Sequence, residues 1–168
     1  AGRLMQQELE ALDYALNNPS QPVAAIVGGN KISTKIKVLE NLIGKVDHLI
    51  VGGAMANTFL YASGVSVGSS LCEKDMADTA ENIIKKAENC NCEIHLPVDA
   101  VVSDELNDGV TSNIVSIDSI PPEKMVLDVG PETADNIGVL LGKCKTLVWN
   151  GPLGAFEFKP FDAGTNAI

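Results

Sequence analysis

The sequence predicts an α/β fold of three layers, Rossmann-like, with a mainly parallel sheet. Short apolar runs end in glycine turns that lead into helical patterns, at residues 23–43 and again at 48–62. Such repeated strand, turn and helix units place successive strands in parallel. The runs are apolar throughout rather than alternating, which is typical of strands buried on both faces. The low aromatic content of 4% favours the same class over an aromatic-rich β-sandwich.

The first half of the chain contains the clearest elements. Residues 4–16 predict an amphipathic helix, because apolar residues recur there at three- and four-residue spacing. These residues are Met5, Leu9, Leu12 and Leu16. A strand at 23–27 is followed by a second helix, and a strand at 48–51 by a third helix at 54–62. The apolar face of the second helix consists of Ile32, Ile36, Leu39 and Ile43.

The second half continues the pattern with an excursion at the edge of the sheet. A helix is predicted at 75–87, and Pro97 separates two extended segments. The predicted extended segments are residues 93–96, 98–102, 113–117, 125–129 and 145–149. Further helices are predicted at 132–141 and 161–168, and Pro131 suits the first turn of the former. Because the last helix reaches the end of the chain, we expect a fold that is incomplete at the C-terminus.

Length and charge limit the possible functions. A chain of 168 residues with 45% hydrophobic content is long enough for one core, so we expect one domain over residues 1–168. The net charge of -10 argues against nucleic acid and anionic membranes as partners, because an acidic surface repels phosphates. Any phosphate site must therefore be a local basic island. No run approaches the roughly 20 apolar residues of a membrane span, and we expect a cytoplasmic protein.

The spacing of cysteines and histidines predicts no metal site. The cysteines contain no C-x-x-C pair; they are Cys72, Cys90, Cys92 and Cys144. His48 and His95 lack the close partner spacing of a zinc site. We therefore expect reduced thiols and no metal ligand among the 168 residues.

Glycine turns follow several of the predicted strands. They are Gly28-Gly29, Gly52-Gly53, Gly130-Pro131 and Asn150-Gly151-Pro152. In open α/β sheets ligands bind beyond the carboxyl ends of the strands, where helix N-termini present free N–H groups to anions. A single glycine pair at such a turn is more often explained by a positive φ or by tight packing. Four glycine turns at corresponding strand ends together indicate a ligand site. None matches G-x-G-x-x-G or G-x-x-x-x-G-K-[ST], which disfavours a Rossmann dehydrogenase and a P-loop ATPase.

Two lysines follow the first glycine turn. Lys31 and Lys35 lie four residues apart at the opening of the predicted helix, so we expect both ammonium groups on one face near the strand end. Lysines at the positive end of a helix are unfavourable unless an anion also binds there. Phosphate binding is the favoured interpretation, and a solvated lysine face is the alternative.

Five segments resemble phosphoglycerate kinases in order and spacing. They are Gly28–Lys35, Ile50–Phe59, Leu96–Asp99, Leu127–Pro131 and Trp149–Glu157. The last, W-N-G-P-L-G-A-F-E, is the most specific, and the resemblance covers essentially all 168 residues. It implies the nucleotide-binding lobe of a glycolytic enzyme, with residues 1–16 as the interdomain helix. That family transfers a phosphoryl group reversibly from 1,3-bisphosphoglycerate to ADP, giving ATP and 3-phosphoglycerate, with Mg²⁺.

The resemblance implies roles for individual residues. Lys31 follows the phosphoryl group in transfer and Lys35 holds the terminal phosphates of ADP or ATP, which suits a reaction catalysed by positioning and positive charge. Asn150 approaches the phosphates, and Glu157 accepts hydrogen bonds from the ribose hydroxyls. The remaining nucleotide-binding residues are Gly28, Gly29, Asn30, Gly52, Gly53, Gly130, Gly151, Leu153 and Phe156.

Other readings of these residues stay open at the level of sequence. Phe156 could be plain core, Glu157 a solvated acid and Asn150 a turn former. Trp149 is expected in the core. Two residues depart from the family pattern: Asn30 stands where the family usually has Ala or Ser, and Ala54 where it usually has Gly. Each adds bulk beside the adenine slot.

Parts of the family's sequence have no counterpart here. The lobe that binds phosphoglycerate in the family has no counterpart in this sequence. We therefore expect 3-phosphoglycerate or 1,3-bisphosphoglycerate to bind only through that other lobe. The Gly-Gly-Gly-Asp segment, whose aspartate meets Mg-nucleotide, is expected beyond residue 168. The chain starts without methionine, and we expect a fragment that is inactive alone. The alternative is a non-catalytic nucleotide-binding or interaction module.

Overall fold

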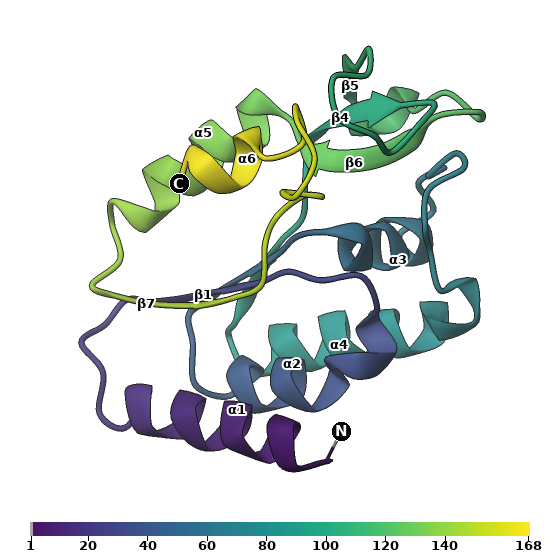
Figure 1. Ribbon diagram of the computed structural model, residues 1–168. Coiled ribbons are helices and arrows are strands. Elements are labelled where there is room, and N and C mark those ends of the chain that lie inside the picture. Colours follow the sequence, from purple (N-terminus) through teal and green to yellow (C-terminus); the bar gives the residue numbers. More distant parts are fainter. Residues whose placement is uncertain (1) are drawn as a thin grey trace.

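The fold is a four-stranded parallel sheet between two groups of helices, with a small second sheet beside it (Figure 1). The structure is a computed structural model that describes residues 2–168, without the side chains of residues 2–5, 8 and 9. Helices α1, α2, α3 and α4 cover one face of the parallel sheet, and α5 covers the other. The predicted three-layer α/β fold is confirmed.

The parallel sheet has the strand order β3-β2-β1-β7. Its strands are β1 Val23–Val27, β2 His48–Val51, β3 Glu93–His95 and β7 Thr146–Asn150. The chain moves from β1 outward to β3 and then returns to pair β7 on the other side of β1. The order of strands therefore reverses between β1 and β7, and such a switch point opens a crevice at the carboxyl ends of the strands.

The helices are close to the predicted positions. Their bounds are α1 Gly2–Ala15, α2 Ile36–Ile43, α3 Ala54–Ala62, α4 Ala77–Asn89, α5 Pro131–Leu141 and α6 Ala163–Asn166. Short 3₁₀ turns lie at Ile32–Thr34, Lys74–Met76 and Ile117–Ser119. The final helix, predicted at 161–168, is only four residues long, because residues 161–162 belong to a turn and the helix ends at Asn166.

Alternate residues of β1 enter two different cores. Val23, Ala25 and Val27 pack in the cluster formed with α1 to α4, whereas Ala24 and Ile26 pack in the cluster beneath α5. All five residues are fully buried, as expected for a strand covered on both faces. The continuous apolar run in the sequence is therefore the mark of a central strand.

The helix α1 contributes to the first core through its C-terminal half. Leu12 is buried there, and so is Leu16, which directly follows the end of α1, as their spacing predicts. The side chains of Met5 and Leu9, the other members of the predicted apolar row, lie outside the described residues. None of the described helices is both long and apolar enough to cross a bilayer.

The second sheet corrects one expectation. Strands β4 Asp99–Ser103, β5 Asn113–Ser116 and β6 Met125–Val129 form a separate antiparallel sheet in the order β5-β4-β6. The segments 98–102 and 125–129 were expected to continue the mainly parallel sheet, and the second of them ends at the turn Gly130-Pro131. They instead bury Ala100 and Val102 against α3, in a third core cluster. An apolar run gives no indication of which strand it pairs with.

Candidate functional site

The loops after β1, β2 and β7 interlock at the carboxyl end of the parallel sheet. Gly28 donates its N–H to the carbonyl of Asn150 at 2.8 Å, and Gly53 donates to the carbonyl of Leu153 at the same distance. The N–H of Met55, in the first turn of α3, is bonded to the carbonyl of Gly29 at 2.9 Å. Three of the four predicted glycine turns are thus brought together at the switch point.

Close backbone approach explains why glycines stand in these loops. A Cβ on Gly28 would lie 1.8 Å from the carbonyl oxygen of Pro152, and one on Gly52 would lie 2.3 Å from Cδ2 of Leu153. Gly151 has φ +88° and Gly53 has φ +66°, in the left-handed region. Packing between the loops therefore requires these glycines even before any ligand is considered.

Lys35 reaches across to the last residue of β7. Its Nζ donates a hydrogen bond of 2.9 Å to Oδ1 of Asn150, and both side chains are partly buried. Asn150 immediately precedes the turn whose Pro152 contacts Gly28. The structure therefore places an ammonium group at the switch point.

Lys31 and Lys35 do not share a helix face, which corrects the predicted local geometry. Lys31 is extended, with φ -137° and ψ 126°, and α2 begins only after Lys35. Side-chain hydrogen bonds compete with the helix here: Thr34 Oγ1 donates to the carbonyl of Lys31 at 2.8 Å, and the Ser33 N–H donates to Glu73 Oε2 at 3.1 Å. The segment between the lysines is consequently a 3₁₀ turn.

Glu73 is a charged neighbour of Lys31. Burial favours its protonated form, but hydrogen bonds from the hydroxyl and N–H of Ser33 and from the N–H of Ile32, with the charge of Lys31, together bring the pKa of Glu73 below its ordinary value. The carboxylate thus anchors the turn that carries Lys31. The sequence offered no sign of it, because Glu73 lies 40 residues from Ser33.

A mainly apolar cavity of about 210 Å³ adjoins the interlocked loops. Of the predicted nucleotide-binding residues, its wall includes Gly29, Asn30, Gly53 and Leu153. Ala54, the other departure from the family pattern, also lines it. The other wall residues, which are not among the predicted nucleotide-binding residues, are Ala56, Asn57, Leu71, Pro97, Leu106, Met125, Val126, Leu127, Asp128, Val129, Pro152, Gly154 and Ala155. A flat, uncharged ring fits a cavity of this chemistry better than a phosphate does.

Asp128 is the one acidic residue in that wall, and it is 2% exposed. Its carboxylate accepts hydrogen bonds from the N–H groups of Gly164 at 2.8 Å and Val129 at 2.9 Å. Burial raises the pKa of Asp128 to about 6 despite these two bonds, and the charge of Asp162 adds to the increase. Asp128 holds α6 against β6, which is a structural task.

Gly130 lies apart from the other glycine turns. It follows β6 in the second sheet, and a Cβ there would lie 2.2 Å from the carboxylate of Asp99. That carboxylate accepts hydrogen bonds from the N–H groups of Glu132 and Thr133, at 3.0 and 2.8 Å, and so occupies the N-terminus of α5. The helix end that the sequence suggested for an anion is therefore already capped by the protein.

Trp149 and Phe156 are more exposed than a core position allows, whereas Phe161 is fully buried. Trp149 was expected in the core but is 38% exposed, because β7 is the last strand of the described sheet and one of its faces is only partly covered. Its indole Nε1 donates to the carbonyl of Gly151 at 2.7 Å. Phe156 is 48% exposed and Glu157 is also exposed, and neither belongs to the cavity wall. The four cysteines are free, as predicted.

Comparison with known proteins places the whole chain in one family. The family model for phosphoglycerate kinase matches residues 1–168. The chain is 54% identical over 167 residues to the phosphoglycerate kinase of Cereibacter sphaeroides and 56% identical over 167 residues to that of Bradyrhizobium diazoefficiens. Each alignment covers 99% of this chain but only 42% of the relative. The chain thus spans about two fifths of the length of these relatives.

Solved structures agree with the sequence comparison. The phosphoglycerate kinase of Coxiella burnetii superposes with a TM-score of 0.90 at 48% identity, over 98% of this chain and 42% of that one. The enzyme of Pyrococcus horikoshii superposes with a TM-score of 0.79 at 29% identity, with the same coverage. Because the family model matches the whole chain and the fold superposes on these structures, the chain belongs to the phosphoglycerate kinase family.

Proposed function

We propose that these 168 residues form the nucleotide-binding part of a phosphoglycerate kinase, which transfers a phosphoryl group between 1,3-bisphosphoglycerate and ADP. The observation that carries the proposal is the hydrogen bond from Lys35 to Asn150, which holds a cation beside an apolar cavity at the switch point of the sheet. An apolar slot next to a fixed positive charge suits a ligand with an aromatic base at one end and phosphates at the other.

Different residues of the site would contact the adenine and the phosphates of the nucleotide. The cavity takes the adenine between Gly29, Gly53 and Leu153. Lys35 and Asn150 receive the terminal phosphates, and Lys31 follows the transferred group from its extended position beside Glu73. Gly28, Gly52 and Gly151 set the shape of these loops, whereas contacts of Gly130, Phe156 and Glu157 with the nucleotide stay predictions.

Mg²⁺ accompanies the nucleotide's phosphates in this proposal, as in the family. Asp128 does not fit as its ligand, because its carboxylate already accepts two backbone hydrogen bonds and burial favours the protonated form. We infer that the metal-binding aspartate belongs to sequence beyond residue 168, and that the site for 3-phosphoglycerate or 1,3-bisphosphoglycerate belongs to another lobe. Residues 1–168 then act as one domain, with α1 as the interdomain helix and the cytoplasm as its compartment.

Calorimetric titration of the chain with ADP and Mg²⁺ tests nucleotide binding. We expect weak binding by the wild-type chain, weaker binding by Lys35→Ala, and no turnover of 1,3-bisphosphoglycerate by either. Circular dichroism establishes that both proteins are folded. A folded wild-type chain without affinity for ADP would overturn the proposal.

The second candidate is a non-catalytic nucleotide-binding or interaction module. Asn30 and Ala54 favour it, because both line the cavity and both are larger than the residues usual in the family. A chimera separates the two functions: this chain replaces the corresponding region of the Cereibacter sphaeroides enzyme. Turnover by the chimera that is lost in its Lys31→Ala variant supports the kinase, whereas a folded, ADP-binding chimera without turnover supports the module.

A further inference from the structure

Three potential metal ligands lie together on the sheet, far from the glycine turns. His48 is the first residue of β2, while Glu93 and His95 are the first and last residues of β3. His48 lies opposite Glu93 in the strand pairing, and Ile50 lies opposite His95. Gly52 follows the other end of β2, roughly 13 Å along the strand at about 3.3 Å per residue.

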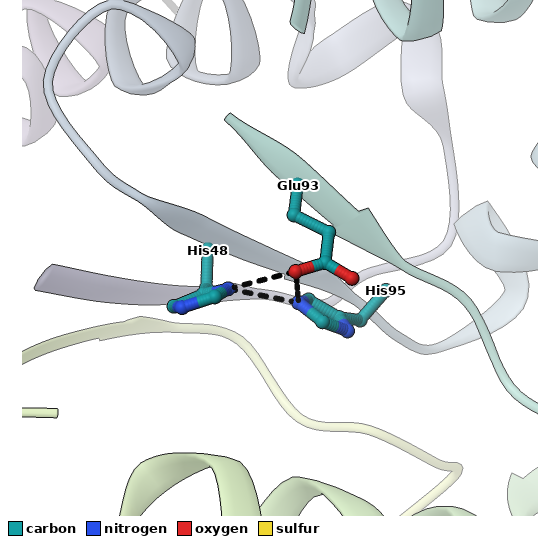
Figure 2. Close-up of side chains that lie close together, drawn as sticks. All are labelled: His48, Glu93 and His95. Atoms are coloured by element: carbon teal, nitrogen blue, oxygen red, sulfur yellow. Dashed lines mark hydrogen bonds and ion pairs between the residues drawn. The ribbon is translucent and has the colours of Figure 1, made fainter. Parts of the chain in front are cut away.

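The three side chains lie on the same face of the sheet. Residues two apart along a strand share a face, so His48 lies with Ile50, and Glu93 with His95. Ile50 belongs to the core cluster beneath α5, which identifies the face. Figure 2 shows the two imidazole rings side by side with the Glu93 carboxylate turned toward both.

The donor atoms form a compact triangle. His48 Nδ1 is 3.1 Å from His95 Nε2, and Glu93 Oε2 is 3.4 Å from the first nitrogen and 3.6 Å from the second. A tetrahedral ion with bonds of about 2.0–2.2 Å separates its ligand atoms by roughly 3.3–3.6 Å. Two of the three distances lie within this range and the distance between the histidine nitrogens is slightly shorter, so the triangle is close to the size of one face of a tetrahedral site before any ion is bound.

Polar residues are common on an edge strand, and β3 is the edge of the described sheet. These three differ because they converge instead of pointing separately into solvent. The side chains of His48 and His95 are only 22% and 26% exposed, so their rings are held by their surroundings. The Glu93 side chain is 66% exposed and leaves an open approach for an ion.

We propose that His48, Glu93 and His95 bind a Zn²⁺ ion through His48 Nδ1, His95 Nε2 and one carboxylate oxygen, with water as the fourth ligand. Two imidazoles and a carboxylate suit zinc and similar transition ions, whereas Mg²⁺ prefers oxygen ligands alone. The site is therefore independent of the Mg²⁺ that would accompany a nucleotide. In the metal-free protein one of the two facing nitrogens carries the hydrogen of their hydrogen bond. On zinc binding that ring takes its other tautomer, with the hydrogen on its far nitrogen, so both facing nitrogens offer a lone pair to the ion.

Zinc at this position links two strands. The ion would bind one residue of β2 and two of β3, a strand of three residues that otherwise pairs on a single side. An ion that binds the folded state but not the unfolded chain raises the unfolding temperature. At a hundredfold excess of Zn²⁺ over Kd, we expect a rise in Tm of roughly 5–10 °C.

Titration with Zn²⁺ and with Co²⁺ tests the site in the 168-residue chain. We expect one zinc ion per chain, a visible Co²⁺ spectrum of the tetrahedral type and no displacement by millimolar Mg²⁺. His48→Ala and Glu93→Gln should each weaken zinc binding at least roughly tenfold and abolish the rise in Tm. Glu93→Gln changes one exposed side chain, so its folding is not in question even if the histidine variant is unstable.

The matched control is Glu88→Gln, which removes another exposed carboxylate, on α4, outside the triangle. It should bind zinc as the wild-type chain does. Thiolate coordination is recognised by near-ultraviolet charge-transfer bands of the Co²⁺ form, which we expect to be absent. Zinc binding that is equal in the wild-type chain and Glu93→Gln, strong thiolate bands, or no zinc binding by the folded chain would each overturn the proposal.

Discussion

The ammonium group of Lys35 is bonded to Oδ1 of Asn150 at 2.9 Å, although 115 residues separate the two in the sequence. The bond connects the start of α2 with the end of β7, on the two sides of the switch point. An ammonium group fixed in this way needs little reorganisation when an anion arrives.

Replacement of Lys35 by Ala should weaken ADP binding by roughly tenfold to a hundredfold, the effect of losing a hydrogen bond to a charged group of about 1.5–3 kcal/mol. Lys37→Ala is the control, because Lys37 is an exposed lysine in the first turn of α2, which begins directly after Lys35. Calorimetry measures both dissociation constants. Equal losses of ADP affinity in the two variants would show that Lys35 contributes only to the overall positive charge around the start of α2.

Removal of bulk from the cavity wall should strengthen nucleotide binding. Ala54→Gly and Asn30→Ala each shorten a side chain that lines the cavity, and one methyl group in a pocket changes affinity by roughly tenfold or more. We expect a lower Kd for ADP in both single variants and the lowest in the double variant. Unchanged or weaker binding in the double variant would mean that neither side chain obstructs the base.

Gly28→Ala should destabilise the fold by at least about 2 kcal/mol, because the new methyl group would overlap the backbone of Pro152. Gly44→Ala is the matched control: a Cβ at Gly44 meets no atom within 4 Å, and its φ is -83°. Urea denaturation measures both free energies of unfolding. Equal stability of the two variants would contradict the close contact between the first and last loops.

Because of Asp128, the free energy of unfolding should fall as the pH rises from about 4 to about 6. Its pKa in the folded protein is about 6, against an ordinary value of 3.8. Between these two pKa values the folded state keeps a proton that the unfolded chain has released. The contribution of Asp128 to the free energy of unfolding is therefore fully present below the unfolded-state pKa and is lost above the folded-state pKa. The difference between the two pKa values corresponds to about 3 kcal/mol in the free energy of unfolding.

Urea denaturation of the wild-type chain and of Asp128→Asn, from pH 4 to pH 7, isolates this contribution. The variant loses one hydrogen-bond acceptor and is expected to be less stable at low pH, but residue 128 no longer titrates. The stability advantage of the wild-type chain should therefore shrink as the pH rises. A constant difference between the two proteins would rule out the raised pKa.

Continuous apolar runs predicted the parallel strands well. Residues 23–27 and 49–51 are buried, and each strand is followed by a glycine that the neighbouring loops require. The same kind of run at 125–129 belongs to a different, antiparallel sheet. Local sequence describes how a strand is buried but not which strand it pairs with, since pairing depends on segments distant in the chain.

The candidate sites show the same limit. Lys35 and Asn150 were predicted at one site from the order of strand ends and from the family resemblance, and they are in contact. The convergence of His48 and His95 was not foreseen, because 47 residues separate them and only the pairing of β2 with β3 unites them. The 3₁₀ turn between the two lysines depends on Glu73, which is equally remote.

The position of Trp149 gives the chain a built-in optical reporter. It is the single tryptophan of the sequence, it directly precedes the asparagine that binds Lys35, and its indole N–H is bonded to the carbonyl of Gly151. Its ring is partly in solvent, so its fluorescence responds to small changes in its surroundings. Movement of the loop after β7 can therefore be followed in the unlabelled protein, from the emission of one residue at the switch point.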